Sequence, residues 1–180
     1  MNEITLDEVS QEAQAVIRDI PDFPKKGIVF KDIMPLLANY EVFNKTIKFM
    51  ADHYRGRGIT KVIGIEARGF ILAAPLAIEL QAGMVTVRKK GKLPYKTIAK
   101  TYDLEYGQDT LEIHEDAIKP GEKVLIVDDV LATGGTIKAV CDLVEQLNGK
   151  VESVAMLIEL DFLKGREKIA GYDLLSLIKY

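Results

Sequence analysis

The sequence has little of what disulfide-rich, metal-centred or membrane proteins need. It has one cysteine, so it cannot form an internal disulfide, and with two histidines it lacks the ligands for the common zinc cages. No apolar run approaches the roughly 18 residues of a membrane-spanning helix, and the acidic N-terminus resembles neither a signal nor a transit peptide. We therefore expect a soluble protein of the reducing cytoplasm with no membrane partner.

A strong charge imbalance is also absent. Lys and Arg number 24 against 27 Asp and Glu, a net charge of −3, so a nucleic-acid partner is not expected. The length of 180 residues fits one domain, for which roughly 100–200 residues are usual. Hydrophobic residues make up 48% and charged residues 28%, as in ordinary globular proteins. We expect a single domain over residues 1–180.

The order of predicted elements indicates an α/β fold. Thr5 followed by Glu8 has capping-box spacing and predicts a helix over 5–19, and a second helix is expected over 41–54. Between them, the proline-rich stretch 21–35 allows only a short extended piece at 28–30. Strand-like and helical patterns then alternate, with strands at 61–65, 84–89, 123–129 and 150–160 and helices at 70–81 and 136–149.

This alternation predicts a parallel, twisted sheet flanked by helices. Ligands of such sheets bind beyond the carboxyl ends of the strands, so the site is expected at loops 65–69 and 128–136. The second loop belongs to the run VLIVDDVLATGGT, in which an apolar strand delivers Asp128 and Asp129 and residues 133–136 open a helix. Free N–H groups at a helix start favour an anion, and glycine lets the backbone approach it.

The same loop has no lysine, and the chain has no GxxxxGK[ST] motif, so a triphosphate-binding P-loop is excluded. A donor-rich cup without a cation suits a single phosphate monoester. The paired aspartates suit the hydroxyls of a sugar or a hydrated magnesium ion. The alternative is that Asp128 and Asp129 are ordinary strand-end residues and the glycines form an ordinary turn.

The run resembles the phosphoribosyl pyrophosphate (PRPP) signature of the type I phosphoribosyltransferases. Six further segments, from about residue 15 onward, are similar to the adenine phosphoribosyltransferases: IPDFP, GIVFKDI, EARGF, RKKGKLP, YDLEYG and LKGREK. The resemblance implies the type I fold, with an N-terminal helix and hood segment in residues 1–38 and a flexible lid over residues 88–107. The stretch from Arg88 to Lys100 contains six basic residues and no acidic one.

The resemblance assigns the parts of PRPP to these segments. It implies that Asp128 and Asp129 hold the ribose hydroxyls and that a cup binds the 5′-phosphate, formed by Ala132, Thr133, Gly134, Gly135 and Thr136. Pyrophosphate would be bound by the first loop and the lid, through Glu66, Ala67, Arg68, Lys89 and Lys92. A cis peptide is typical of this family in that loop, here between Glu66 and Ala67. Magnesium would be held mainly by substrate and water, with no direct side-chain ligand.

Adenine recognition is assigned by the same resemblance. Val29 and Lys31 would meet the base through their backbone, Phe30 would stack on it, and Leu160 would cover its other face. Phe30 as a plain core residue is the alternative, and many relatives have arginine where this chain has Lys31. Glu105 is the candidate catalytic residue, as carrier of a ring-nitrogen proton, against the alternative of a solvated loop glutamate.

The implied activity is purine salvage: adenine and PRPP give AMP and pyrophosphate, with Mg²⁺, in a homodimer. One alternative is a type I enzyme for another base, such as xanthine, hypoxanthine or orotate. A second alternative is a non-catalytic PRPP-sensing regulator, although 180 residues leave no room for an added DNA-binding domain. A third is an RNA binder that acts through the basic loop. Cys141 is expected in a helix core, and His53 and His114 at the surface.

Overall fold

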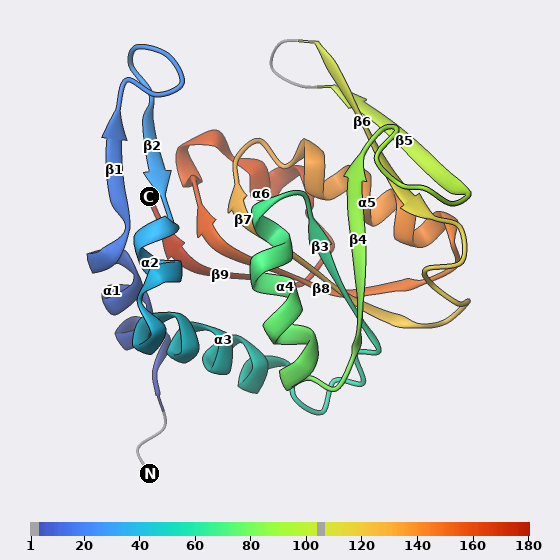
Figure 1. Ribbon diagram of the computed structural model, residues 1–180, viewed down its shortest axis with the longest axis horizontal. Coiled ribbons are helices and arrows are strands. Elements are labelled where there is room, and N and C mark those ends of the chain that lie inside the picture. The colour runs from blue at the N-terminus through green and yellow to red at the C-terminus, as the bar shows by residue number, and fades with distance from the viewer. Residues whose placement is uncertain (1–3, 104–106) are drawn as a thin grey trace. The chain divides into compact units, whose positions relative to one another are not determined.

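The computed structural model describes residues 4–103 and 107–180 (Figure 1). The chain divides into two compact units, Met1–His53 and Tyr54–Tyr180. Glu105, the candidate proton carrier, lies outside the described residues. No described helix has both the length and the hydropathy needed to cross a bilayer.

The first unit contains three helices and a two-stranded antiparallel sheet. In chain order its elements are α1 (Leu6–Val16), β1 (Arg18–Pro21), β2 (Val29–Asp32), α2 (Met34–Ala38) and α3 (Tyr40–Tyr54). The predicted capping box is confirmed, because the Glu8 N–H donates to Thr5 Oγ1 and the Thr5 N–H donates to the Glu8 carboxylate. The first helix ends at Val16, earlier than predicted, since Ile17 is extended and leads into β1.

The second unit is built on a seven-stranded sheet in the order β5-β6-β4-β3-β7-β8-β9. The strands are β3 (Lys61–Ile65), β4 (Gly83–Lys89), β5 (Thr97–Asp103), β6 (Gln108–His114), β7 (Lys123–Leu131), β8 (Lys150–Glu159) and β9 (Leu174–Lys179). The five strands from β4 to β9 in this order are parallel, as predicted. The structure adds an antiparallel pair, with β6 against β4 and β5 against β6.

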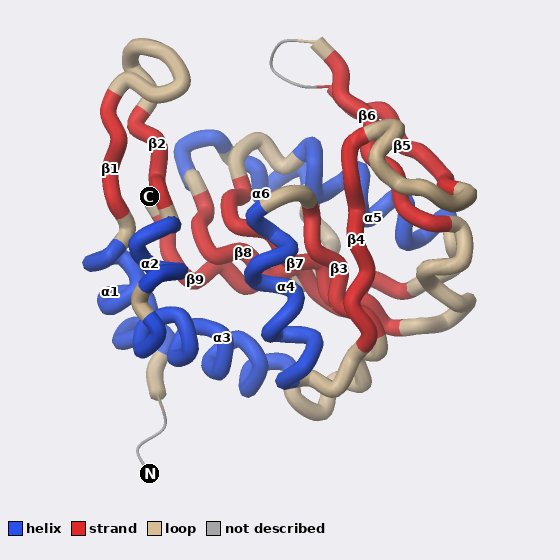
Figure 2. Tube along the Cα trace, viewed as in Figure 1, coloured by secondary structure: helices blue, strands red, loops and turns tan. Residues whose placement is uncertain are grey.

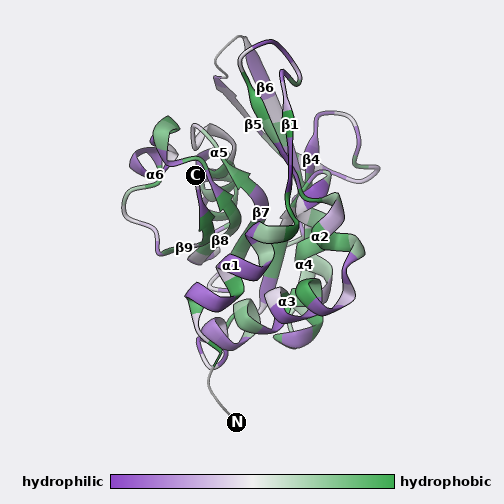
Figure 3. Ribbon diagram, turned by 90° about the vertical axis from the view of Figure 1, so that its left-hand side faces the viewer, coloured by the Kyte–Doolittle hydropathy of each residue, from purple (hydrophilic) through white to green (hydrophobic). Residues whose placement is uncertain are grey.

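Helices cover both faces of this sheet, α4 (Arg68–Glu79) one face and α5 (Gly135–Gln146) the other (Figure 2). The core cluster on the α5 side includes Cys141, which is buried as predicted; burial raises the pKa of its thiol to about 12. On the α4 side, a Cβ at Gly64 would come within 2.9 Å of the Ala73 Cβ, so glycine allows the helix to lie close to β3. The apolar run of β8 and β9 is green in Figure 3.

Three features of this unit differ from the sequence interpretation. The strand predicted at 150–160 is not the last of the sheet, because β9 pairs beside β8 at the edge. Leu160 lies just after β8, and the short η1 (Asp161–Leu163) and α6 (Gly165–Lys168) lead on to β9. His114 is half-buried, with its ring edge-on to Tyr95 at 6.1 Å, whereas His53 is exposed as predicted. Seven of the 20 residues expected as a lid form strand β5, in which exposed and less exposed residues alternate.

The topology determines where the two strand-end loops lie. Strands β4, β3 and β7 are parallel neighbours, so their carboxyl ends, at Lys89, Ile65 and Leu131, meet at one edge of the sheet. In parallel sheets this edge is where ligands bind. Helices α4 and α5 both begin here, within the EARGF and ATGGT segments.

Candidate active site

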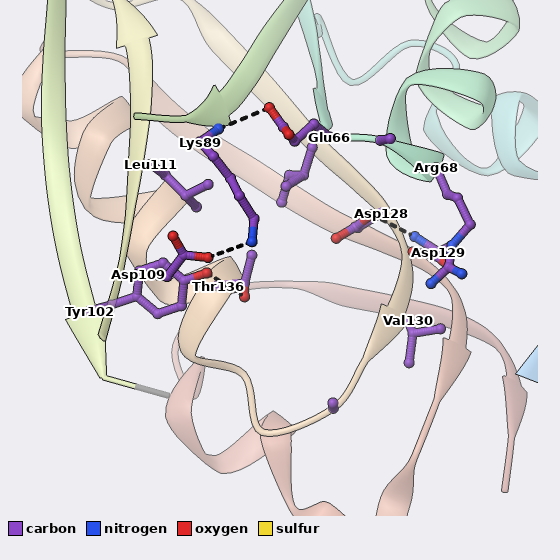
Figure 4. Close-up of a pocket in the computed structure, with 13 residues that line it drawn as sticks. Glu66, Arg68, Lys89, Tyr102, Asp109, Leu111, Asp128, Asp129, Val130 and Thr136 are labelled. Atoms are coloured by element: carbon purple, nitrogen blue, oxygen red, sulfur yellow. Dashed lines mark hydrogen bonds and ion pairs between the residues drawn. The ribbon is translucent and has the colours of Figure 1, made fainter. Parts of the chain in front are cut away.

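A cavity of about 560 Å³ opens at this edge of the sheet (Figure 4). Its lining comes from the ends of β3, β4 and β7, from the β5–β6 pair and from the start of α5: Ile65, Glu66, Ala67, Arg68, Lys89, Tyr102, Asp109, Leu111, Asp128, Asp129, Val130, Ala132 and Thr136. Eight of the twelve residues assigned to ribose, phosphate and pyrophosphate therefore line one cavity, and Lys92, Thr133, Gly134 and Gly135 do not. The strand that carries the aspartates continues to Leu131, beyond its predicted end.

The two aspartates are held differently. Asp129 is almost buried, and its Oδ2 lies 2.6 Å from Nε of Arg68, which stands at the start of α4. Asp128 Oδ1 accepts a hydrogen bond of 2.9 Å from the Asp129 N–H. Burial, and then the charge of Asp129, raise the pKa of the Asp128 carboxyl well above its ordinary value. The site thus contains one carboxylate matched by a cation and one acceptor with a raised pKa.

The predicted phosphate cup lies beside the aspartates. A small hollow of about 70 Å³, which shares Asp128, Ala132 and Thr136 with the main cavity, also includes Thr133 and Gly134. Gly134 is the N-cap of α5 with φ of 80°, a left-handed conformation that glycine adopts readily. The first N–H groups of α5 are therefore available to an anion.

On the side of β4, three cations gather around Glu66, and of these Lys89 lines the cavity. Glu66, whose side chain is nearly buried, accepts hydrogen bonds from Arg88 Nε at 3.1 Å and from the Lys89 N–H at 2.9 Å, and it also pairs with Lys92. Burial raises the pKa of Glu66, but the hydrogen bonds from Lys92, Lys89 and Arg88 outweigh it and lower the pKa below its ordinary value. The peptide between Glu66 and Ala67 is cis, which confirms that prediction.

Five lining residues had no assigned role in the sequence interpretation: Ile65 and Val130 at the ends of β3 and β7, and Tyr102, Asp109 and Leu111 on the β5–β6 pair. Asp109 on β6 pairs with Lys89, with Oδ2 and Nζ 2.9 Å apart, and Leu111 lies two residues further along the same strand. Tyr102 on β5 accepts a 3.2 Å hydrogen bond from the Thr136 hydroxyl. The only sequence signal for the three residues on β5 and β6 is the alternating pattern of two strands, and that pattern does not reveal which face points at the cavity.

The residues assigned to adenine are divided between the two units. Val29, Phe30 and Lys31 lie on β2 of the first unit, where Phe30 meets the Phe23 ring edge-on at 5.3 Å and Lys31 Nζ lies 2.8 Å from Asp19 Oδ1. Leu160 lies in the second unit, just beyond β8, and its N–H donates to the Leu131 carbonyl at 2.9 Å. It is not among the residues that line the cavity, and neither is Lys92.

The oxygen, nitrogen and sulfur side chains of the described residues indicate how a metal cation would be held. No group of three or more His, Cys, Asp or Glu side chains able to hold a metal ion occurs among residues 4–103 and 107–180. Asp128 and Asp129 offer the hard oxygen ligands that Mg²⁺ prefers, but Arg68 already faces one of them. This set fits an ion that arrives with a phosphorylated substrate and keeps most of its water.

A strand-end carboxylate pair beside a helix N-terminus, opposite a cluster of cations, suits a sugar bearing phosphate groups at both ends. The fold and this site define a phosphoribosyltransferase, and the sequence model of the phosphoribosyl transferase domain matches residues 35–175.

Comparisons with individual proteins narrow the family. The chain is 57% identical to an adenine phosphoribosyltransferase of Geobacter metallireducens, over 94% of this chain and 99% of the relative. It is 54% identical to the crystal structure of the enzyme of that name from Thermoanaerobacter pseudethanolicus, with a TM-score of 0.92 and coverage of 95% and 99%. The Saccharomyces cerevisiae enzyme, complexed with an imino-altritol bisphosphate and adenine, is 39% identical with a TM-score of 0.91 and the same coverage. The chain belongs to the adenine phosphoribosyltransferase family.

Proposed function

We propose that this protein transfers the 5-phosphoribosyl group of PRPP to adenine, giving AMP and pyrophosphate in purine salvage. The observation that carries the proposal is the arrangement of one cavity. It brings together Asp128 and Asp129, the start of α5 with Thr136, and Lys89 at the end of β4. Names of relatives at 54–57% identity over nearly the whole chain support adenine as the base.

In the reaction the bond between ribose C1′ and the pyrophosphate oxygen breaks, and a bond from C1′ to a ring nitrogen of adenine forms. The proton on that nitrogen must leave. Pyrophosphate is already an activated leaving group, so the protein's contribution is to position the reactants, stabilise the departing charge and exclude water.

The residues of the cavity divide these tasks. Asp128 accepts hydrogen bonds from the ribose hydroxyls, and Asp129, oriented by Arg68, shares this role. Thr133, Thr136 and the first N–H groups of α5 hold the 5′-phosphate, which fixes the far end of the substrate. The cations at the end of β4 and Arg68 stabilise the charge that develops on pyrophosphate as the C1′ bond breaks.

Mg²⁺ is part of this proposal, bound chiefly to PRPP and water, where it neutralises charge on the pyrophosphate leaving group. The proposal also includes adenine binding by Val29, Phe30, Lys31 and Leu160, a lid function for residues 88–107, and Glu105 as the proton carrier. An alternative base is disfavoured by the names of the relatives, and a non-catalytic regulator by the match to enzymes over nearly their full length.

A homodimer in the cytoplasm completes the proposal. Its physical support is an apolar surface on α4, where Ile71 and Ile78, two turns apart, are 40% and 79% exposed. Burying such side chains against a second copy would remove apolar area from water. Light scattering coupled to size-exclusion chromatography tests it, and a monomer mass at micromolar concentration would contradict it.

A substrate panel tests the proposed activity. Pyrophosphate release is measured with PRPP and Mg²⁺ and with adenine, hypoxanthine, xanthine or orotate as the base, and the nucleotide product is identified by mass. We expect AMP formation from adenine, with kcat/KM at least about a hundredfold above the other bases, because buried polar groups left unpaired by the wrong base discriminate strongly. Preference for a 6-oxopurine or orotate contradicts the base assignment, and no release with any base contradicts catalysis.

A further inference from the structure

Lys89 is held at both ends by carboxylates that come from different strands. Its backbone N–H donates to Glu66 Oε2 at 2.9 Å, just beyond β3, and its ammonium lies 2.9 Å from Oδ2 of Asp109 on β6. In Figure 4 its side chain extends from Glu66 to Asp109 along the wall of the cavity. Arg88 and Lys92, its basic neighbours, both pair with Glu66 instead.

The position of Asp109 is itself fixed from two sides. Its Oδ1 accepts a 2.8 Å hydrogen bond from the Thr110 N–H, which leaves Oδ2 for Lys89. Across the β5–β6 ladder it stands directly opposite Tyr102. Tyr102 in turn receives the hydrogen bond of Thr136, a residue of the phosphate cup. A continuous series of contacts therefore connects the phosphate cup with the ammonium of Lys89.

Both members of the Lys89–Asp109 pair are charged at neutral pH. The hydrogen bond to Asp109 raises the pKa of Lys89. Burial raises the pKa of Asp109, but the hydrogen bonds from Lys89 and Thr110 lower it below its ordinary value. An acid in a cavity built for a polyanion repels the ligand, so its presence calls for a compensating role.

We propose that Asp109 is a positioning residue that keeps the Lys89 ammonium inside the cavity, ready for the pyrophosphate group of the substrate. This inference rests on the proposed function. The Lys89 side chain is 57% exposed, and without a partner its flexible stem would sample many rotamers in solvent. Because Asp109 already holds the Lys89 ammonium in place, less conformational entropy is lost when Lys89 binds the anion. This favourable contribution to binding exceeds the repulsion between the Asp109 carboxylate and the ligand.

A double-mutant cycle on the full-length protein tests the inference. The variants are Asp109→Ala, Lys89→Met and the two combined, with Asp116→Ala as the control, because Asp116 is an exposed acid in the turn after β6. The dissociation constant of inorganic pyrophosphate with Mg²⁺ is measured by calorimetry, and KM for PRPP and kcat are measured separately. Asp109→Asn keeps an oxygen acceptor and serves as a second, milder variant.

We expect Asp109→Ala to weaken pyrophosphate binding and raise KM for PRPP by about tenfold, within the range of coupling between contacting residues. In the Lys89→Met background the same change should have less than about a twofold effect, since no ammonium remains to be positioned. Asp109→Asn should fall between Asp109→Ala and the wild type, and Asp116→Ala should match the wild type.

Equal or tighter pyrophosphate binding by Asp109→Ala, or an unchanged effect of that substitution in the Lys89→Met background, overturns the inference. If Asp109→Ala does not fold, as judged by its thermal transition, the comparison is made with Asp109→Asn alone. If the proposed function is wrong, the result differs from both of these outcomes, because the wild-type protein would then bind pyrophosphate but form no AMP from adenine and PRPP.

Discussion

Gly165 lies so close to Ala132 that no side chain fits between them. A Cβ on Gly165 would overlap the Ala132 carbonyl oxygen, and a Cβ on Gly134 would overlap the carbonyl oxygen of Gly165. The LKGREK segment, remote in sequence, thus packs directly against the phosphate cup.

A methyl group at this contact should distort the cup. We expect Gly165→Ala to raise KM for PRPP by about tenfold or more and to lower the free energy of unfolding by about 1–3 kcal/mol, as overpacking against backbone usually does. Steady-state kinetics and urea unfolding measure the two effects. Gly83→Ala is the control, because its Cβ would come closest to the flexible Lys61 side chain, at 3.3 Å, and would lie 3.8 Å from the Thr60 carbonyl oxygen, an ordinary contact distance. A wild-type KM for Gly165→Ala would refute the packing argument.

Asp128 should cost the protein stability while serving its activity. Its pKa is raised by burial and by Asp129, so the folded state favours the protonated form. The contribution of protonated Asp128 to the free energy of unfolding is therefore fully present below its pKa in the unfolded chain, about 3.9, and is lost as the pH rises through its pKa in the folded protein. Asp128→Asn keeps the acceptor for the Asp129 N–H and removes the charge.

We therefore expect Asp128→Asn to raise Tm at pH 7, by about 2–4 °C for each kcal/mol gained, and this advantage should shrink as the pH falls toward 4. Activity should fall by about a hundredfold or more, further still when combined with Asp129→Asn, because hydrogen bonds to the reacting sugar are weakened. Calorimetry across pH and turnover with adenine check both expectations. A lower Tm at pH 7, or near-normal turnover of the double variant, would show that the assigned role is wrong.

Arg166 anchors the LKGREK segment to the end of β8. Its guanidinium binds Glu159 with two hydrogen bonds, Nε to Oε1 at 2.9 Å and Nη2 to Oε2 at 2.6 Å, and the Glu159 side chain is 2% exposed. The hydrogen bond from Arg166 is the main reason that the pKa of Glu159 is lowered. The stability from this pair is thus present above the unfolded pKa of about 4.3 and is lost as the pH falls through the folded pKa.

Arg166→Ala should lower the free energy of unfolding at pH 7 by about 3 kcal/mol, since a buried carboxylate loses its main partner. The difference in the free energy of unfolding between the wild type and Arg166→Ala should become smaller as the pH falls. Urea unfolding at several pH values measures this difference. Lys96→Ala provides the comparison: its ion pair with Glu115 spans 3.9 Å and its side chain is 74% exposed, so about 0–0.5 kcal/mol is expected. Equal losses for the two variants would contradict the anchoring role.

Local patterns were enough to predict much of the second unit. The apolar runs at 61–65 and 123–129, with helical patterns after each, predicted parallel strands joined by crossover helices, and the strand bounds were close. The β5–β6 pair and β9 were less predictable, because pairing partners distant in sequence decide whether a short alternating segment becomes a strand. For the same reason β1 was not predicted from its four residues.

The amino-acid sequence by itself predicted where along the chain the residues proposed to bind PRPP lie, since the order strand, DD, TGGT, helix is a local pattern whose geometry follows from strand and helix starts. Only the tertiary structure decided that Asp109 and Tyr102 line the same cavity and that Gly165 supports the cup. Those contacts join segments far apart in the chain, and they depend on strand order and register, which no local pattern specifies. The second unit is thus organised around one edge of its sheet, where three strand ends meet.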